Sequence, residues 1–443
     1  MKSKSVKAGT SRREALLSAA TGALAVLAAS KAGAVQSPGA PLDGSRIRDR
    51  FAIEPGLAYM NTGTFGPPLL EALEIETKDR LAMSRNYPIH FVDHYMTKTL
   101  PELVGQMAAF VGASPDEIAF TTGSTESMSY IANGLDLREG DEILATTHEH
   151  QAGAYPWILA GKRRGCRLKL ATLKTPVTRA PDVVDTIAAA ITPRTRVLSI
   201  CHINYTDGFI MPVKELVALG RSLGLITVVD GAQAIGMLDV NLHDIGCDFY
   251  AGSLHKWLGC PYGTGLLYVR DAMREKLWPS VVEGYDGWDD TDFYGVKAQG
   301  PAVNFGDLWP KALLKYSSNF HYFGPLFWTL PAAIRFQREF GPKGVETRIR
   351  ELGRYAHAEL SKINKIKVVT PENPAYFAGL IAWEIGGGST FQFSRSMRME
   401  HRVVVRNVTH TPIHFDVVRA STHIFNTEED VNRLTAAVRK KLA

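Results

Sequence analysis

Cysteine is scarce in this chain of 443 residues, with only four scattered through it. Cys166, Cys201, Cys247 and Cys260 are too few and too far apart for a disulfide scaffold or a zinc-binding motif. Cys201 and Cys247 lie within apolar runs, where a cysteine acts as a small core residue. The composition, 45% hydrophobic and 21% charged, is that of an ordinary globular protein and predicts one large and one smaller domain.

The chain also lacks a net charge once its first 34 residues are set aside. Residues 1–34 contain six Lys or Arg and one Glu, which accounts for the whole formal charge of +5. The basic pI therefore does not indicate a surface for nucleic acid or for a membrane. We expect a small-molecule partner, no nucleic acid, and no membrane association after the first segment is removed.

Residues 1–34 have the organisation of a signal peptide. A basic segment with Arg12 and Arg13 precedes an apolar run of small residues, and Ala-Gly-Ala follows at 32–34. The apolar run is shorter than the roughly 20 residues that a membrane-spanning helix needs. Paired arginines are typical of the twin-arginine route, although Ala15 departs from that motif. We expect export to the periplasm by this route; the alternative is a basic tail without structure.

A lysine at the end of an apolar run is the most informative feature of the remaining chain. Segment 248–259 reads Asp-Phe-Tyr-Ala-Gly-Ser-Leu-His-Lys-Trp-Leu-Gly, and its first half predicts a buried strand that ends just before Lys256. Lysine is rarely buried without a partner. One partner that fits is an aldehyde cofactor, which the amine binds as a Schiff base. The alternative is a surface lysine whose charged end stays in water.

A carboxylate ends another apolar run 26 residues earlier, where Asp230 closes segment 225–230. Pyridoxal 5'-phosphate needs a lysine for its aldehyde and an anion that keeps its pyridine nitrogen protonated. Parallel strands would bring Asp230 and Lys256 to the same carboxyl edge of a sheet, where open α/β sheets bind ligands. The two residues together therefore favour the cofactor interpretation of Lys256.

Other strand ends carry polar residues as well. Gly-Ser-Thr at 123–125 follows a strand and opens a helix, an arrangement that either binds phosphate or caps the helix. His148 and His150 follow the next strand, and we expect a helix to begin at Pro156-Trp157. The two histidines suggest a metal, but no third ligand lies near them in the sequence. The ring of His150 could instead stack on a planar cofactor.

Alternating short strands and helices between residues 115 and 270 predict a mostly parallel α/β sheet. We expect an N-terminal segment at 35–75, a large domain at 76–325 and a small α+β domain at 326–443. Asn61 lies in a turn that opens a helix near Leu69, where its side chain could line the mouth of a site. The Gly- and aromatic-rich segment 279–325 is either a loop that covers the substrate or irregular packing.

These motifs resemble those of the class V aminotransferases, in the fold type I superfamily of pyridoxal phosphate enzymes. The similarity extends over nearly all of residues 50–440. Segment 248–256 followed by Gly263-x-Gly265 is similar to the family's cofactor-attachment motif, and His-Lys-Trp-Leu at 255–258 resembles the isopenicillin N epimerase-like branch. The resemblance implies a mostly parallel seven-stranded sheet in the large domain, a small α+β C-terminal domain, and a homodimer.

The resemblance also implies roles for individual residues. Lys256 would bind the cofactor aldehyde and move the α-proton of the substrate, and Asp230 would hold the pyridine nitrogen. His150 would stack on the ring and Gln233 would bind its phenolate oxygen. The phosphate would be bound by Ser124, Thr125, Ser253 and His255. Arg419, followed by Ala-Ser, would bind the α-carboxylate of the substrate, and Asn61 is a further candidate for substrate binding.

The chain departs from the family pattern in three places. Leu254 is bulky where the family usually has a small residue, and Phe320 stands where the family often has a threonine that reaches a partner's phosphate. The family's asparagine after Cys201 corresponds to Asn204 or Tyr205. No cysteine follows Cys260, so the mobile cysteine that carries sulfur in cysteine desulfurases is missing.

The expected function is that of a pyridoxal phosphate enzyme acting on the α-carbon of an amino-acid-type substrate, as an aminotransferase or an isopenicillin N epimerase-like isomerase. A pyridoxal phosphate-dependent C–S lyase is the second alternative. A third is a non-catalytic ligand-binding protein on the same scaffold, which a lack of spectral response to amino acids would favour.

Overall fold

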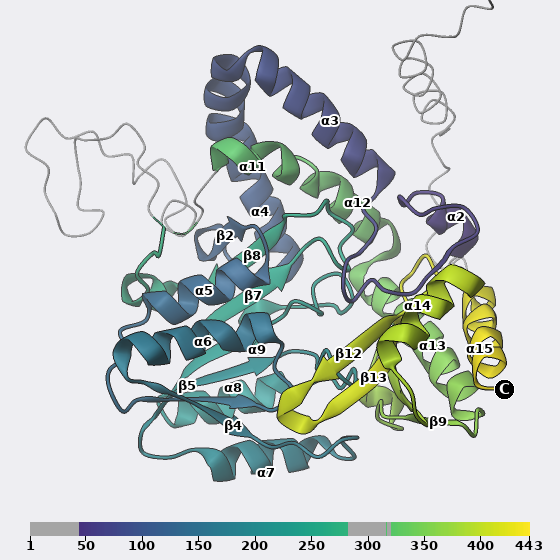
Figure 1. Cartoon of the computed structure of the whole chain (residues 1–443). Helices are drawn as coiled ribbons and strands as arrows, with labels where there is room; N and C mark the ends of the chain where they lie inside the picture. The colour runs from purple at the N-terminus through teal and green to yellow at the C-terminus, as the bar shows by residue number, and fades with distance from the viewer. Residues whose placement is uncertain (1–43, 282–315, 317–319) are drawn as a thin grey trace, which may run out of the picture. The chain divides into compact units, whose positions relative to one another are not determined.

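The computed structural model describes residues 44–281, Tyr316 and residues 320–443 (Figure 1). The predicted signal peptide at 1–34 and most of segment 279–325, including Ser317 to Asn319, lie outside the described residues, so export and a covering loop stay predictions. Within the described part, no helix is both long and apolar enough to cross a membrane.

A seven-stranded sheet forms the centre of the large domain, with the strand order β2-β8-β7-β6-β5-β3-β4. All neighbouring pairs are parallel except those of β8, which is antiparallel to β2 and to β7. This confirms the predicted α/β fold with a mostly parallel seven-stranded sheet. The strands are β2 (Ile118–Thr121), β3 (Glu142–Thr146), β4 (Arg167–Ala171), β5 (Thr195–Cys201), β6 (Ile226–Asp230), β7 (Phe249–Ser253) and β8 (Gly265–Val269).

Both faces of this sheet are covered, as its continuous apolar runs require. Alternate residues of a strand enter different clusters: Val228 packs in one core and Val229 in the other. Helices α5 (Ser124–Gly134) and α6 (Gln151–Arg164) contribute to the core that contains Val228. Helices α4 (Leu100–Val111), α8 (Val213–Ser222) and α12 (Leu330–Phe340) contribute to the core that contains Val229. A buried sheet of this kind leaves its carboxyl edge as the place for a ligand.

The C-terminal part is built on a four-stranded antiparallel sheet with the order β12-β13-β10-β9, as the predicted α+β domain requires. Its strands are β9 (Ile366–Val368), β10 (Leu380–Ile385), β12 (Arg406–His410) and β13 (Phe415–Ser421), and its helices are α13 (Pro342–Ser361), α14 (Thr390–His401) and α15 (Glu428–Leu442). Figure 1 shows α14 beside β12, and the two elements are in contact.

The N-terminal segment joins this C-terminal part. Strand β1 (Ala58–Tyr59) pairs in parallel with β11 (Val403–Val404), and helix α2 (Gly44–Arg48) and helix α3 (Leu70–Arg85) flank it in the chain. The helix expected near Leu69 is α3 and is confirmed. The exact domain boundaries at residues 75 and 325 stay predictions.

Helix α6 begins earlier than the sequence indicated. The helix was expected to begin at Pro156-Trp157, but it begins at Gln151 and Pro156 lies inside it. The prediction was wrong because His150 caps the helix, accepting a hydrogen bond from the Ala152 N–H at its Nδ1 (3.1 Å). Histidine is not among the preferred N-cap residues, so the start carried no recognisable signal.

Two buried histidines predict loss of stability in mild acid. Burial lowers the pKa of His202 and of His423 to about 4, whereas an unfolded histidine titrates near 6.5. Each therefore contributes stability that is complete above pH 6.5 and is lost as pH falls through 4. Between pH 7.5 and 5 we expect each to lower the free energy of unfolding by roughly 2 kcal/mol, measured by urea denaturation.

A variant separates these two histidines from other titrating groups. His423→Gln cannot gain a proton, so its unfolding free energy is expected to fall by less between pH 7.5 and 5 than that of the wild type. The exposed His94, changed to Gln, is the control and should retain the full pH effect. An unfolding free energy that is equal at both pH values in the wild type would contradict the assignment.

Candidate active site

A cavity of about 590 Å³ lies at the carboxyl edge of the seven-stranded sheet. The ends of β5, β6 and β7 line it, together with the starts of α5 and α6, the loop 63–65 and strands β12 and β13. The predicted site residues that line this cavity are Ser124, Thr125, His150, Asp230, Gln233, Ser253, His255, Lys256 and Arg419. Residues up to 295 positions apart in the chain are thus brought to one place, as the strand-end argument required.

Asp230 and Lys256 enter this cavity from neighbouring parallel strands. Asp230 ends β6 and lies opposite Ala251 of β7, and the chain then runs from the end of β7 at Ser253 to Lys256. The carbonyl of His255 accepts a hydrogen bond from the Gly66 N–H (3.0 Å), which fixes the backbone beside the lysine. This confirms that the carboxylate and the amine share one edge of the sheet.

The cavity changes the acidity of both groups. Burial lowers the pKa of Lys256 to about 8, although the carboxylate of Asp230 acts in the opposite direction. A sizeable fraction of the amine is therefore neutral just above neutral pH, which is the form that attacks a carbonyl or accepts a proton. Burial raises the pKa of Asp230, while the N–H of Ala232 and the charge of Lys256 lower it. A cation placed against this carboxylate would favour its ionised form.

The start of α6 positions His150 and approaches Asp230. His150 caps the helix, and Gly153 lies one turn on with Asp230 Oδ2 so close that a Cβ atom there would come within 2.9 Å of it. His150 keeps part of its surface exposed to solvent, while partial removal of its ring from water and the positive charges of Lys256 and Arg419 lower its pKa to about 4. The imidazole is therefore neutral at neutral pH, with Nδ1 occupied by the Ala152 N–H. A neutral flat ring of this kind suits stacking on an aromatic cofactor.

The start of α5 forms a cradle for an anion. Ser253 Oγ donates to Ser124 Oγ (3.0 Å) and accepts from the Ser124 N–H (3.3 Å). Nδ1 of His255 donates to the Thr264 carbonyl (3.1 Å), which leaves Nε2 as its other ring nitrogen. Gly123 packs directly on Gly265, since a Cβ on Gly265 would lie 2.3 Å from Gly123 Cα. An 11-residue helix that begins at a cavity, with the hydroxyls of Ser124, Thr125 and Ser253 beside its first turn, is suited to phosphate.

Arg419 is almost completely buried, with 2% of its surface exposed. Its Nη1 donates to the Tyr205 carbonyl (2.7 Å) and its Nη2 to Thr64 Oγ1 (3.1 Å), whereas its Nε has no hydrogen-bond partner. Burial lowers the pKa of this guanidinium to about 10. Within the described ranges, no carboxylate forms an ion pair with it. A buried cation in this state fits the carboxylate of a bound substrate.

The model of the aminotransferase class-V family matches residues 66–306 of the chain, more than half of its length. The chain belongs to the class V aminotransferase family. Two curated relatives are similar over most of their length. The isopenicillin N epimerase of Streptomyces clavuligerus is 30% identical over 89% of this chain and 98% of its own. A cysteine desulfurase of Yersinia pestis is 29% identical over 80% of this chain and 84% of its own.

Solved structures share the fold. A C-DES mutant with glycine covalently linked to its PLP cofactor has a TM-score of 0.77 at 23% identity, covering 88% of this chain and 98% of that one. The apo cysteine desulfurase of Thermococcus onnurineus NA1 also has a TM-score of 0.77, at 22% identity, covering 93% and 99%. Fold type I is therefore shown, and with the family match the chain is an enzyme of the class V aminotransferase family.

Gln233 is held by two contacts in this class V site. Its Nε2 donates to the Gly63 carbonyl (2.7 Å), and its Oε1 accepts from Trp257 Nε1 (2.9 Å). One amide hydrogen remains for a ligand, so the expected bond to the ring oxygen stays a prediction. Trp257 is itself fixed, because its carbonyl accepts from His423 Nε2 (3.0 Å) and its ring stacks on that histidine. Trp257, the residue after Lys256, thus anchors the side-chain amide of Gln233.

Asn61 does not line the cavity. Its Oδ1 accepts a hydrogen bond from Thr64 Oγ1 (2.7 Å), and Thr64 in turn accepts from Arg419. The turn reaches the cavity through Gly63, Thr64 and Phe65 instead. Contact between Asn61 and the substrate stays a prediction, and the structure assigns Asn61 the role of orienting Thr64.

Two polar residues that line the cavity received no definite role from the sequence, although Tyr205 was one of two candidates for the family's asparagine. The hydroxyl of Tyr205 lies 2.7 Å from His410 Nδ1, and Nε2 of His410 donates to the Thr147 carbonyl, so the tyrosine is the donor to a neutral imidazole. Its ring also packs at 80° on that of His150, 4.7 Å between centroids. Arg406 at the start of β12 is the second such residue. The β12–β13 register, which places Arg406 opposite Arg419, reveals that Arg406 belongs to this cavity, because nothing in the local sequence around Arg406 indicates a site.

Asn204 is fully buried and does not line the cavity, although it lies next to Tyr205 in the loop after β5. Its Oδ1 accepts from the Cys201 thiol (3.2 Å), while its Nδ2 has no hydrogen-bond partner. Burial raises the pKa of Cys201 well above its usual value, so this thiol stays protonated. All four cysteines are free and buried.

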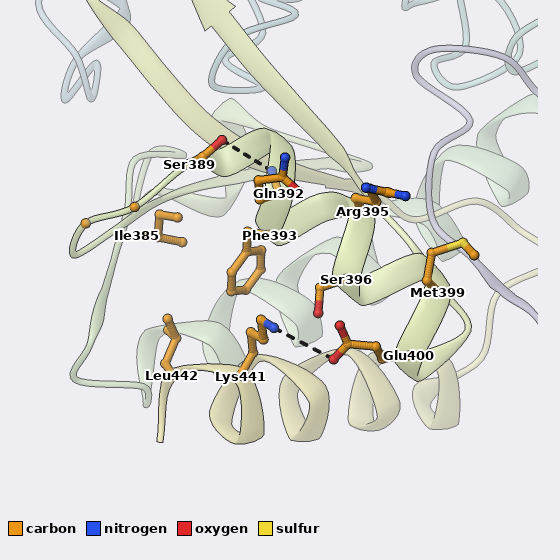
Figure 2. Close-up of a pocket in the computed structure, with 12 residues that line it drawn as sticks. Ile385, Ser389, Gln392, Phe393, Arg395, Ser396, Met399, Glu400, Lys441 and Leu442 are labelled. Carbon is orange, nitrogen blue, oxygen red and sulfur yellow. Dashed lines mark hydrogen bonds and ion pairs between the residues drawn. The ribbon is translucent and has the colours of Figure 1, made fainter.

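A second cavity, of about 560 Å³, lies between α14 and the end of α15 (Figure 2). Glu400 and Lys441 form an ion pair across it (3.7 Å), and Phe393 gives it an apolar wall. The exposed Arg395 lies on its rim. None of the residues predicted to bind cofactor or substrate lines it, so the cavity around Lys256 is the candidate active site.

Proposed function

We propose that the protein binds pyridoxal 5'-phosphate at Lys256 and acts on the α-carbon of an amino-acid-type substrate, as an epimerase or an aminotransferase. The observation that carries the proposal is the meeting of Asp230 and Lys256 in one cavity from neighbouring strand ends. The similarity to isopenicillin N epimerase over 98% of that protein supports the choice of reaction.

The donor set fits this cofactor. The start of α5, with Ser124, Thr125 and Ser253, would hold the phosphate. Asp230 would face the pyridine nitrogen, whose positive charge compensates the burial of the carboxylate. When bound, pyridoxal phosphate supplies an electron-withdrawing ring that stabilises negative charge at the substrate α-carbon.

The residues of the chain then have distinct tasks. The α-carboxylate of the substrate would lie on Arg419, whose unpartnered Nε marks the open position. Lys256, with its pKa lowered to about 8, would take the α-proton at Nζ and return it. His150 is neutral and held by the Ala152 N–H, so it would pack on the ring without competing for that proton.

The test is deuterium exchange at the α-carbon. The protein, incubated with the cofactor, would be given a panel of L- and D-amino acids in D2O, and the loss of the α-proton signal would be followed by NMR. Chiral chromatography then detects epimerisation, keto-acid assays detect transamination, and sulfide release detects C–S cleavage. Exchange with either of the first two products supports the proposal. Sulfide release without them favours the C–S lyase, and no exchange with any amino acid favours a binding protein.

The close approach of α6 to Asp230 gives a prediction for Gly153→Ala. The added methyl would lie within 2.9 Å of Asp230 Oδ2, so the carboxylate must move although no functional group is removed. We expect the affinity for pyridoxal phosphate to fall by about tenfold or more, since small displacements in a site have large effects. The measurement is a titration of the visible absorption of the bound cofactor.

Gly105→Ala is the matched control, because Gly105 is also helical and a Cβ there meets nothing within 4 Å. It should leave the affinity unchanged and raise the free energy of unfolding by about 0.5–1 kcal/mol. Equal affinities for the two alanine variants would show that the carboxylate does not set the cofactor position.

A further inference from the structure

Arg406 and Arg419 lie directly opposite each other on neighbouring strands. The register of β12 and β13 pairs them, and both line the cavity that contains Lys256. Directly opposed residues of an antiparallel pair point to the same face with their Cβ atoms about 5 Å apart, and like charges in this position are destabilising. Two arginines placed in this way are unfavourable unless an anion compensates them.

No such anion belongs to the described part of the chain. Neither arginine forms an ion pair within those ranges, and Arg406 has no side-chain hydrogen bond there either. The charge of Arg406 extends into the cavity, because it lowers the pKa of Arg419 and that of His150. The two arginines therefore bring two positive charges to this wall of the cavity, one more than the α-carboxylate of an amino acid would neutralise.

The two arginines differ in depth. Arg419 is buried, whereas Arg406 is exposed at the edge of the cavity. On the same face of β12, two and four residues on, lie Val408 and His410, and His410 is bonded to Tyr205. Because Arg406 lies directly opposite Arg419, a group on the side chain of a substrate whose α-carboxylate lies on Arg419 could reach Arg406.

We propose that the substrate has a second anionic group, on its side chain, and that Arg406 binds it at the mouth of the cavity. This inference rests on the proposed function, because it assigns the α-carboxylate to Arg419. The substrate class is then an amino acid with an acidic side chain or a derivative with an acidic end. By binding the acidic group, Arg406 would favour this substrate over a neutral amino acid of the same length.

The test compares ligands that differ only in the second carboxylate. Succinate, glutarate and adipate would be titrated by calorimetry into the cofactor-loaded protein, beside butyrate, valerate and hexanoate. At least one dicarboxylate is expected to bind roughly three- to tenfold more tightly than the monocarboxylate of equal length, as fits a partly exposed ion pair. This advantage should disappear in Arg406→Gln.

Arg395→Gln is the matched control, because it removes an exposed arginine at the rim of the other cavity (Figure 2), and it should retain the full advantage. Arg406→Gln is also expected to unfold at the same or a higher temperature, since it relieves a like-charge pair. A dicarboxylate advantage that is absent in the wild type, or that persists in Arg406→Gln, would overturn the inference. The visible absorption of the same sample reports cofactor binding. A sample without this absorption would overturn the proposed function as well.

Discussion

Replacing Lys256 with alanine is expected to lower turnover by at least about 10³-fold and to abolish covalent attachment of the cofactor. A positioned general base alone contributes roughly 10²–10⁴-fold, and this amine is also the proposed attachment point. The cradle at Ser124 and the carboxylate of Asp230 remain, so the variant should still bind the cofactor, with a shifted visible absorption band. The measurements are the absorption spectrum and the rate of α-deuterium exchange.

The control for this variant is Lys174→Ala, which removes an exposed lysine of the same chain. It should keep the wild-type spectrum and rate. Turnover of Lys256→Ala within tenfold of the wild type would mean that another residue moves the α-proton, and the assignment of Lys256 would have to be abandoned.

Arg419→Met is expected to raise KM for an amino-acid substrate by roughly 30-fold or more. Removing one partner of a buried, hydrogen-bonded charge pair costs about 2–5 kcal/mol of binding free energy. The melting temperature without substrate should be unchanged or higher, because the variant removes a buried charge that has no carboxylate partner in the described structure. Steady-state kinetics and thermal unfolding measure the two effects.

Arg419→Lys separates charge from geometry. It keeps a cation but not the planar fork that matches a carboxylate, so KM is expected to lie between those of the wild type and Arg419→Met. The exposed Arg395→Gln serves again as the control and should leave KM unchanged. A KM for Arg419→Met within threefold of the wild type would place the α-carboxylate elsewhere.

The sequence was sufficient for the sheet and for the central pair of residues. Apolar runs ended by Asp230 and before Lys256 predict buried parallel strands, and parallel strands place their carboxyl ends together. The pairing of Asp230 with Ala251 bears this out. An apolar run that ends at a polar residue is a strong signal, because it depends only on the pattern of residues along one strand.

Contacts between distant segments could not be predicted in the same way. The sequence showed Trp257 only as part of the motif around Lys256. Its hydrogen bond to Gln233 joins two loops that fold on each other, so its role in anchoring Gln233 could not be predicted. Arg406 was missed because its importance depends on a strand register, which a single sequence does not fix. The start of α6 at Gln151 was missed because a histidine supplies the cap.

Asn61 shows a related limit. Its place in a turn beside the cavity was correctly predicted, yet the turn presents Gly63, Thr64 and Phe65 to the cavity instead. The direction of a side chain within a turn depends on backbone angles that composition does not determine. Residues that act through a neighbour, as Asn61 does through Thr64, are therefore the hardest to assign from sequence.

The most direct test of the central claim is to reduce the cofactor-loaded protein with borohydride and to locate the modified residue by mass spectrometry of its peptides. The account predicts a single modified lysine, Lys256, and a lower yield of modification in Asp230→Ala at limiting cofactor concentration. Modification of a different lysine, or of none in a protein that retains its fold, would contradict the claim that the ends of β6 and β7 form the cofactor site.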